Sequence, residues 1–318
     1  MMMYLKFCFL RGNILLFFFI VFAILSQLSL PYYFIDILDQ LSFHIIYGGI
    51  FLIFILIYFK RYFASLICIG FVILLCLQNL FSCRNCNAFE ISKFEHSNSL
   101  RVMTFNVNYL NQFEDFDNFY NLLLNEDPDI IQIQESNETI HNKLNTLNSI
   151  YPYNIGLDRP SSFWGSIILS KYPLLDIAIN EHEFITATLI KNGITYKIIG
   201  AHLVPAGSQI HYNIALNQME NLKTLINKNK GNVILIGDLN MTPYSKRFNK
   251  FLEQTNLYTY YSLKKLTSTW PTFLPNFFGI QIDHVLFSSQ ITMINKKILQ
   301  SFSSDHSPLL IDLIVKKL

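Results

Sequence analysis

The chain has 318 residues, of which 51% are hydrophobic and only 14% are charged, and its formal net charge is +2. Globular domains usually carry about 25% charged residues, and a chain this apolar cannot remain disordered. Five cysteines exclude a disulfide scaffold, and the small net charge gives no reason to expect a nucleic-acid coat protein. There remain a membrane protein, a very apolar globular protein, or one of each joined.

The first hundred residues hold three apolar stretches that are long enough, or nearly so, to cross a membrane, which takes about 20 helical residues. They are residues 14–30, 41–59 and 62–81. Lys6 and Arg11 precede the first stretch as in a signal peptide, but no small-residue cleavage site follows, so a signal anchor is favoured. Buried core helices would need a soluble partner layer that residues 1–99 do not supply. We therefore expect a membrane anchor with three transmembrane helices over residues 1–81.

The short flanks of these stretches predict the orientation of the anchor. Lys60 and Arg61 lie between the second and third stretches, whereas the segment between the first two offers Asp36 and Asp39 but no cation. Because cationic flanks stay in the cytoplasm, the N-terminus and the Lys60 hairpin are expected there. Three crossings then leave everything after Phe81 on the outer side.

Residues 82–99 are expected to form a polar connector between the anchor and the rest of the chain. Cys83 and Cys86 in this connector could close a small disulfide in an oxidising compartment, although an incidental or structural pair is the simpler interpretation. A zinc site would need four ligands, and the sequence offers no second pair.

The pattern changes at Leu100, after which short apolar runs alternate with amphipathic or turn-rich stretches. This alternation predicts one α/β domain over residues 100–318. Strands are expected at residues 101–107, 130–134, 166–170, 196–203, 232–237, 281–287 and 309–315. Helices are expected at residues 113–126, 138–148, 210–227 and 245–255.

Almost every expected strand has a residue at its end that can bind a cation or move a proton. These residues are Asn106, Glu135, His202, Asp238, Asn240, Asp283-His284 and Asp305-His306. Taken singly, an Asn or Asp after a strand is more often a turn former or helix cap, and a lone His is more often a satisfied core residue. Because six such placements occur in one domain, we expect the strand ends to gather into one polar cluster that forms the active site.

The residue types in this cluster limit its chemistry. Carboxylate and amide oxygens without a Cys or His cage suit a hard cation, Mg²⁺ or Mn²⁺, which also takes phosphate oxygens from a substrate. His and Asp supply a base or an orienting group for an attacking water. The sequence contains no P-loop motif and no Gly-x-Ser-x-Gly elbow, so it indicates metal-assisted hydrolysis of a phosphate ester.

Seven segments of this region resemble, in order, those of the endonuclease/exonuclease/phosphatase superfamily. They are residues 104–107, 132–135, 166–171, 200–203, 237–240, 282–285 and 304–309. The Gly-Asp-x-Asn and Ser-Asp-His elements are specific when both occur at this spacing. The stretch from Thr269-Trp270-Pro271 to Asp283-His284, together with the N-terminal spans, resembles a membrane-anchored bacterial subgroup, the YafD-like proteins.

The resemblance implies a four-layer α/β sandwich (DNase I-like) with the site at one end of two packed sheets. It implies that Glu135 is the principal ligand of Mg²⁺ or Mn²⁺, and that Asn106 and Asp305 support it. The preceding three transmembrane helices would place this domain on the periplasmic side of a bacterial inner membrane.

The same resemblance implies the catalytic roles. Asp238 would orient or deprotonate the attacking water, and Asn240 would hold a phosphate oxygen. His306, oriented by Asp283, would contact the phosphate and assist proton transfer. His202 would stabilise charge or protonate the leaving oxygen.

We thus expect a membrane-anchored phosphodiesterase or phosphatase. A nuclease for extracytoplasmic nucleic acid and a noncatalytic ligand-binding module on the same fold are the alternatives. Residues 100–318 contain 18 Lys and Arg against 18 Asp and Glu, which does not favour a duplex nuclease. The clusters Lys246-Arg247-Lys250 and Lys264-Lys265 are interpreted as solvated faces. Lipid headgroups, sugar phosphates and nucleic acid remain possible substrates, and no obligate protein partner is indicated.

Overall fold

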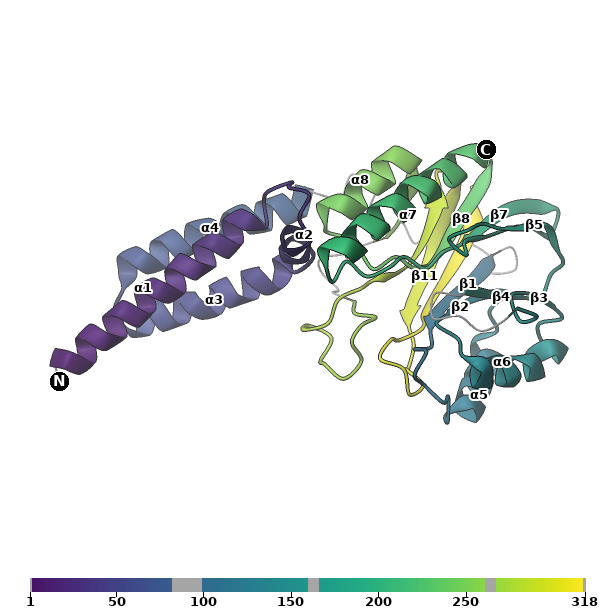
Figure 1. Cartoon of the computed structure of the whole chain (residues 1–318), viewed down its shortest axis with the longest axis horizontal. Coiled ribbons are helices and arrows are strands. Elements are labelled where there is room, and N and C mark those ends of the chain that lie inside the picture. The colour runs from purple at the N-terminus through teal and green to yellow at the C-terminus, as the bar shows by residue number, and fades with distance from the viewer. Residues whose placement is uncertain (1, 82–98, 160–165, 261–266, 317–318) are drawn as a thin grey trace.

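A computed structural model of the chain describes all residues except 1, 82–98, 160–165, 261–266 and 317–318. Figure 1 shows an elongated group of N-terminal helices attached to one end of a body of sheets and helices that begins at Leu100. The Cys83 and Cys86 pair and the Lys264-Lys265 pair lie outside the described residues.

The N-terminal part consists of four helices, of which three pack around a shared apolar seam. They are α1 (Met2–Leu25), α2 (Tyr33–Gln40), α3 (Ser42–Tyr58) and α4 (Tyr62–Phe81). Ala23 of α1, Leu56 of α3 and Leu75 of α4 are buried in this seam. Other large apolar side chains point outward, and Phe51 and Phe63 are 68% and 80% exposed.

Helix length and composition support fewer crossings than the three expected. Within the described residues, one helix is both long and apolar enough to span a membrane, over Tyr62–Asn79. In α1 the apolar segment within the residues whose side chains are described is Gly12–Leu25, and the helix ends five residues before the expected end of the first span. Helices α2 and α3 reach the required length only together, across a bend of 65°. Over residues 12–81, one crossing, or two if the bent pair forms a single span, therefore satisfies these criteria.

Helix α2 is an element that the sequence did not predict, since the segment with Asp36 and Asp39 was expected only to connect the first two apolar stretches. An isolated helix of eight residues is marginal in water, so its formation requires packing against other elements. Ile35, Asp36, Asp39 and Gln40 are buried on one side of it, against the body that begins at Leu100. Figure 1 shows α2 at the junction of the two parts.

Two six-stranded mixed sheets form the centre of the body. The first has the order β11-β12-β1-β2-β4-β3, with β11 (Ile291–Ile298), β12 (Leu309–Val315), β1 (Leu100–Asn106), β2 (Ile130–Gln134), β4 (Ser166–Ser170) and β3 (Tyr153–Ile155). The second has the order β5-β6-β7-β8-β10-β9, with β5 (Leu174–Ile179), β6 (Ile185–Lys191), β7 (Ile194–Gly200), β8 (Asn232–Asp238), β10 (Asp283–Ser288) and β9 (Leu257–Tyr258). Val102 and Ile130 of one sheet and Ile198 and Ile236 of the other are fully buried in a shared core.

Helices cover the outer face of each sheet. The first sheet carries α5 (Phe116–Glu126), α6 (Glu138–Asn145) and a 3-10 turn over Thr146–Ser149, and the second carries α7 (Gln209–Lys228) and α8 (Lys246–Thr255). Phe105 and Phe119 join β1 to α5, and Leu222 and Phe248 belong to the matching core beneath α7 and α8. The α/β sandwich expected from the sequence is thereby confirmed.

All seven expected strands and all four expected helices are present, and five further strands accompany them. The strands β2, β4 and β12 have the expected ends, and the other expected elements have shifted ends. The additional strands are β3, β5, β6, β9 and β11. β3 and β9 have only three and two residues, and most side chains of the edge strand β5 are exposed. In β11 a register shift between Met293 and Asn295 interrupts the alternation that predicts a strand. Weak or broken periodicity therefore explains most of these omissions.

Strand register brings the polar strand ends to one place. In the parallel pair of β1 and β2, Asn106 lies opposite Gln134, so that Glu135 follows directly beside Asn106. In the antiparallel pair of β8 and β10, Asp238 lies directly opposite Asp283. The inner core holds the two sheets together at this end, and the predicted site residues meet there.

Gly237 permits this arrangement because no larger residue fits before Asp238. Its φ of +144° is a conformation that side chains other than Gly rarely adopt. A Cβ at this position would lie 1.8 Å from the backbone oxygen of Ala201 and 2.7 Å from Oε1 of Gln132. The close approach of β8 to the end of β7 thus depends on the absence of a side chain.

We expect the substitution Gly237→Ala to lower the free energy of unfolding by about 1–3 kcal/mol, since the backbone must move to admit a methyl group. The measurement is urea unfolding of the full-length protein in detergent, followed by tryptophan fluorescence, because both tryptophans lie after residue 100. Gly207→Ala is the control, since its added Cβ meets no atom within 4 Å. Its change should stay within about 0.5 kcal/mol. Equal losses in the two variants would contradict the packing argument.

Candidate functional site

A cavity of about 580 Å³ opens where the two sheets end. Five of the eight sequence-predicted site residues line it, namely Glu135, Asp238, Asn240, Asp305 and His306. The other three contact lining residues from behind and are buried, namely Asn106, His202 and Asp283. The structure thus brings all eight residues together.

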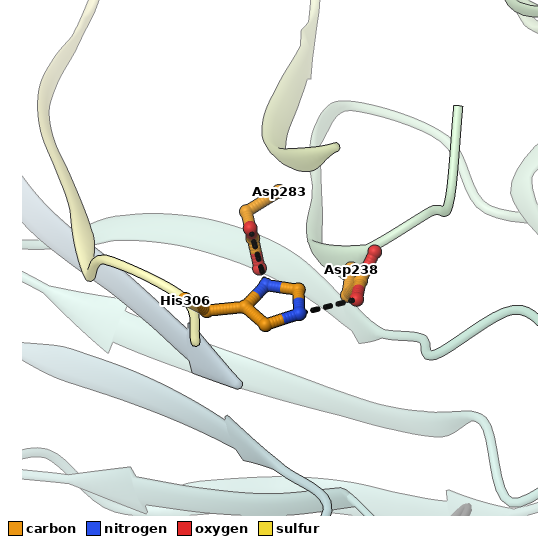
Figure 2. A group of neighbouring side chains, drawn as sticks. All are labelled: Asp238, Asp283 and His306. Atoms are coloured by element: carbon orange, nitrogen blue, oxygen red, sulfur yellow. Dashed lines mark hydrogen bonds and ion pairs between the residues drawn. The ribbon is translucent and has the colours of Figure 1, made fainter. Parts of the chain in front are cut away.

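His306 lies between two buried carboxyl groups, as Figure 2 shows. Its Nδ1 is 2.9 Å from Oδ2 of Asp283, at hydrogen-bond distance, and its Nε2 is 3.8 Å from Oδ2 of Asp238. Ser304 orients the backbone here, because its Oγ accepts from the N–H of His306 at 3.0 Å and donates to the backbone oxygen of Asn106 at 2.8 Å. One loop before β12 thus joins groups from both sheets.

The pKa values of Asp238 and His306 are both raised. Burial, followed by the negative charge of Asp283, raises the pKa of Asp238 to about 8. Burial alone would lower the pKa of His306, but the charge and hydrogen bond of Asp283 outweigh it and raise that pKa to about 9. At neutral pH the imidazole ring is therefore protonated, and it supplies a positive charge between the two carboxyl groups.

Asn106 and Glu135 form a second group on the first sheet. Nδ2 of Asn106 donates to Oε1 of Glu135 at 2.8 Å and to Oδ2 of Asp238 at 3.1 Å, which links the two groups. The backbone N–H of Tyr109 donates to Oε2 of Glu135 at 3.3 Å, and Nε2 of His202 is 3.6 Å from Oε1. Burial is the main cause that raises the pKa of Glu135.

Asn240 is held at both its backbone and its side chain. Its N–H donates to Oδ1 of Asp238 at 2.8 Å, and its Nδ2 donates to the backbone oxygen of Leu203 at 2.7 Å. Its φ of +49° lies in the left-handed region, which Asn tolerates better than most residues. The turn that follows β8 therefore fixes Asn240 beside Asp238.

Asp305 accepts hydrogen bonds from two residues that the sequence analysis did not assign to the site, Asn108 and Trp270. Nδ2 of Asn108 donates to one carboxylate oxygen at 2.8 Å, and the indole Nε1 of Trp270 donates to the other at 2.9 Å. The N–H of Asn108 in turn donates to Oδ1 of Asn106 at 3.0 Å. Two features of the sequence could have indicated these residues. Asn108 lies two residues after Asn106, and Trp270 lies in the Thr269-Trp270-Pro271 stretch that resembles the YafD-like proteins.

More carboxyl groups than cationic groups line the cavity. The carboxyl groups are those of Asp36, Glu135, Asp238 and Asp305, whereas the cations among the described lining residues are the protonated His306 and Arg247, which pairs with Asp36. Hard oxygen donors and carboxyl groups whose pKa is raised by burial fit a divalent cation, whose charge would favour their ionised forms. Glu135 and Asn106 are placed to hold it.

Asp238, Asp283 and His306 also lie close enough to one another to hold a metal ion, with candidate ligand atoms within 4.8 Å. We consider this trio less suitable than the Glu135 group, because the protonated ring of His306 already provides the positive charge that the two carboxyl groups need. Its Nδ1 is also engaged by Asp283.

Comparison with known proteins places the chain in a family. Residues 103–306 match the Endonuclease/Exonuclease/phosphatase family. Comparison with curated protein sequences gives no match. Two packed sheets flanked by helices, with carboxyl, amide and imidazole groups at one end, define a hydrolase of the DNase I-like class. The chain belongs to the Endonuclease/Exonuclease/phosphatase family, whose members act on phosphoesters.

Solved structures share this fold at low sequence identity. An endonuclease/exonuclease/phosphatase from Beutenbergia cavernae is 16% identical, with 69% of this chain and 72% of that chain covered and a TM-score of 0.55. The human Nocturnin catalytic domain, with bound sulfate, is 18% identical, with 69% and 95% covered and a TM-score of 0.52. A beta toxin variant from Staphylococcus aureus, with bound magnesium, is 18% identical, with 69% and 100% covered and a TM-score of 0.50.

The ionisation of His306 is open to a direct test. Its pKa of about 9 exceeds the ordinary value of 6.5, so its contribution to stability is complete below about pH 6.5 and is lost as the pH rises through 9. We expect Asp283→Asn to lower the pKa of His306, because the substitution removes the negative charge of Asp283 and leaves a weaker hydrogen-bond acceptor. Asp305→Asn should lower it less, since Asp305 is the weaker influence. Histidine NMR titration without added metal measures both, and a His306 that titrates at its ordinary value in the wild type would refute the arrangement.

Proposed function

We propose that the chain is a membrane-anchored, metal-dependent phosphoesterase, with residues 1–81 as the anchor, 82–99 as the connector and 100–318 as the catalytic domain. The observation that carries this proposal is the alignment of His306, which Asp283 holds from behind, with Asp238 and Glu135 in one cavity. In this alignment the carboxyl group of Asp238, which titrates near neutral pH, and the protonated imidazole of His306 are held by opposite sheets and lie 3.8 Å apart, so that both could contact one substrate phosphate.

Asp238 is the residue that we assign to the attacking water. A pKa of about 8 lets its carboxyl group take up and return a proton near neutral pH, which is the range that favours a general base. The N–H of Asn240 and Nδ2 of Asn106 both donate to this carboxyl group and fix its orientation. A cation held by Glu135 and Asn106, with Asp305 in support, would supply Lewis-acid stabilisation of phosphate oxygens.

His306, Asn240 and His202 would stabilise the charge that develops on the phosphoryl group. The protonated His306, oriented by Asp283, can donate from Nε2 to a phosphate oxygen. Asn240 would hold a second oxygen, and its turn is fixed by the bond to Leu203. His202, beside Glu135, is assigned to the leaving oxygen. Such preorganised donors stabilise the transition state without reorganisation.

The lining of the cavity bears on the substrate. Its excess of carboxyl groups gives a polyanion little electrostatic attraction, and duplex nucleic acid depends on several cationic contacts. Apolar side chains of Ile37, Leu41, Leu110 and Ile282 also line it. We therefore favour a single phosphate mono- or diester on a partly apolar molecule, such as a lipid headgroup or sugar phosphate, over a nuclease. Bound magnesium in the beta toxin variant and bound sulfate in Nocturnin, on the same fold, support a site for a divalent cation and a tetrahedral anion.

The membrane anchor and its orientation are part of the same proposal. The exposed apolar surface of α1, α3 and α4, with Phe51 and Phe63 outward, supports insertion of these helices in a bilayer. Three crossings with Lys60 and Arg61 inside would place the catalytic part on the periplasmic side of a bacterial inner membrane. This arrangement would agree with the YafD-like subgroup.

We expect Glu135→Gln and His306→Asn each to lower kcat by about 10²–10³, as for other preorganised charged groups. The assay is hydrolysis of bis(4-nitrophenyl) phosphate by the full-length protein in detergent with Mg²⁺, and EDTA should abolish turnover. His182→Gln is the matched control, because His182 lies outside the cavity and bonds to Asn221. Undiminished turnover in the Glu135 or His306 variant would remove these residues from the mechanism.

Orientation is tested with reporter fusions at the C-terminus. A periplasmic catalytic domain should give an active alkaline phosphatase fusion and a dark green-fluorescent-protein fusion. Replacement of Lys60 and Arg61 by Gln should reduce this preference, because these residues form the inner positive flank. A fluorescent fusion without phosphatase activity would place the domain in the cytoplasm.

A further inference from the structure

Helix α2 is attached to the turn that follows Asp238 and carries Asn240. Asp36, Ile37, Gln40 and Leu41, which lie in α2 or immediately after it, line the same cavity as the candidate catalytic residues. The N-terminal helices therefore contribute one wall of the pocket, although the sequence separates them from Asp238 by about two hundred residues. The contacts that α2 makes within this wall indicate that it does more than attach the N-terminal helices to the body.

The first contact passes through a buried ion pair. Nη2 of Arg247 lies 3.0 Å from Oδ2 of Asp36, and the two side chains are 8% and 7% exposed. The same Nη2 is 3.5 Å from the backbone oxygen of Asn240, to which it makes a long hydrogen bond. The guanidinium group also lies over the ring of Tyr212, 5.7 Å from its centroid. Asp36 thus fixes a cation that in turn holds the backbone of Asn240.

The second contact is direct and holds the other end of the same turn. Oε1 of Gln40 accepts from the N–H of Thr242 at 2.6 Å and from its Oγ1 at 2.8 Å, and all three groups are buried. The turn from Asn240 to Thr242 is therefore clamped at two points by α2, once through Arg247 and once by Gln40.

Asn240 needs such support because its backbone is in the left-handed region. A non-Gly residue persists in this region only when surrounding contacts determine its conformation. Its own bonds to Asp238 and Leu203 come from the body of the protein, whereas Arg247 engages the one backbone group of Asn240 that those bonds leave out, its carbonyl oxygen.

We propose that Asp36 is a positioning residue of the catalytic pocket, which acts through Arg247 on Asn240. The proposal rests on the function proposed above, in which Asn240 holds a phosphate oxygen. The membrane anchor then contributes to catalysis through α2, because the segment between its first two apolar helices sets the position of a substrate-binding group. The cluster Lys246-Arg247-Lys250, expected to be a solvated face, is instead divided, since Arg247 is buried and Lys246 pairs with Asp39.

Asp39 provides a matched control on the same helix. Its Oδ2 accepts from the N–H of Lys246 at 2.6 Å, and its Oδ1 is 3.2 Å from Nζ of that residue. This pair also attaches α2 to the start of α8, but Asp39 does not line the catalytic cavity, and Lys246 donates to the backbone oxygen of Ser26 and not to Asn240. A comparison of Asp36 with Asp39 therefore separates the attachment of α2 to α8 from the positioning of Asn240.

The test compares Asp36→Asn, Asp39→Asn and the charge exchange Asp36→Arg with Arg247→Asp in the full-length protein in detergent. Hydrolysis of bis(4-nitrophenyl) phosphate with Mg²⁺ gives kcat and KM, and thermal unfolding gives Tm. We expect Asp36→Asn to lower kcat about tenfold with little change in KM, because a misplaced group costs mainly transition-state binding. Asp39→Asn should also lower Tm, because it weakens a contact between α2 and α8, while kcat stays within about twofold of the wild type.

The charge exchange separates the ion pair from the hydrogen bond. It keeps opposite charges between α2 and α8, so Tm should recover toward the wild type. An Asp at position 247 cannot donate to the carbonyl oxygen of Asn240, so kcat should stay low. Recovery of kcat together with Tm would overturn the proposal, as would equal kcat values for the Asp36→Asn and Asp39→Asn variants.

A second measurement does not depend on turnover. Hydrogen–deuterium exchange of residues 239–245 in the protein without substrate should be faster in Asp36→Asn than in Asp39→Asn, because only the former releases Asn240. Equal protection in the two variants would refute the positioning role even if the wild type is inactive. A wild type that hydrolyses no phosphoester would contradict the proposed function by itself, and the exchange result would still decide the role of Asp36.

Discussion

The site depends on two buried carboxyl groups that face each other across one rung of the second sheet. Asp238 and Asp283 are opposed in the β8 and β10 register, and neither reaches solvent to any useful extent. Two like charges at this separation cannot both be ionised in a buried place without a compensating cation. His306 provides that charge from the loop before β12, which belongs to the first sheet. The positive charge that stabilises the carboxyl groups of the second sheet therefore comes from the first sheet. This end of the sandwich forms its site only when both sheets are packed.

This dependence explains why the polar groups are so closely linked. Asn106 donates to both Glu135 and Asp238, and Ser304 connects the backbone of Asn106 with that of His306. Each of these bonds crosses between segments that the inner apolar core brings together. Small shifts in the packing of the sheets would alter several distances at once, which favours a site that is either fully assembled or absent.

Much of this arrangement could be predicted from the sequence, because strand ends follow from local alternation and polar residues at those ends are visible in the chain. Glu135 and Asp238 were placed correctly at one end of the sandwich for that reason. The contributions of Asn108 and Trp270 were not foreseen, since both act through hydrogen bonds to Asp305 that depend on loop conformation. Helix α2 was missed because its eight residues are helical only when their acidic side meets Lys246 and Arg247, a contact far away in sequence.

The position of α2 also has a practical consequence for work on this protein. Removal of the apolar N-terminal helices would leave the body of sheets and helices as a separate fragment. A fragment that begins near Leu100 would lack one wall of the cavity and would leave Arg247 without its carboxylate partner. Such a fragment could fold and still show altered substrate preference, because water and unrelated molecules would enter where Ile37 and Leu41 now stand. Kinetic constants from a fragment would describe a different, more open enzyme than the full-length chain.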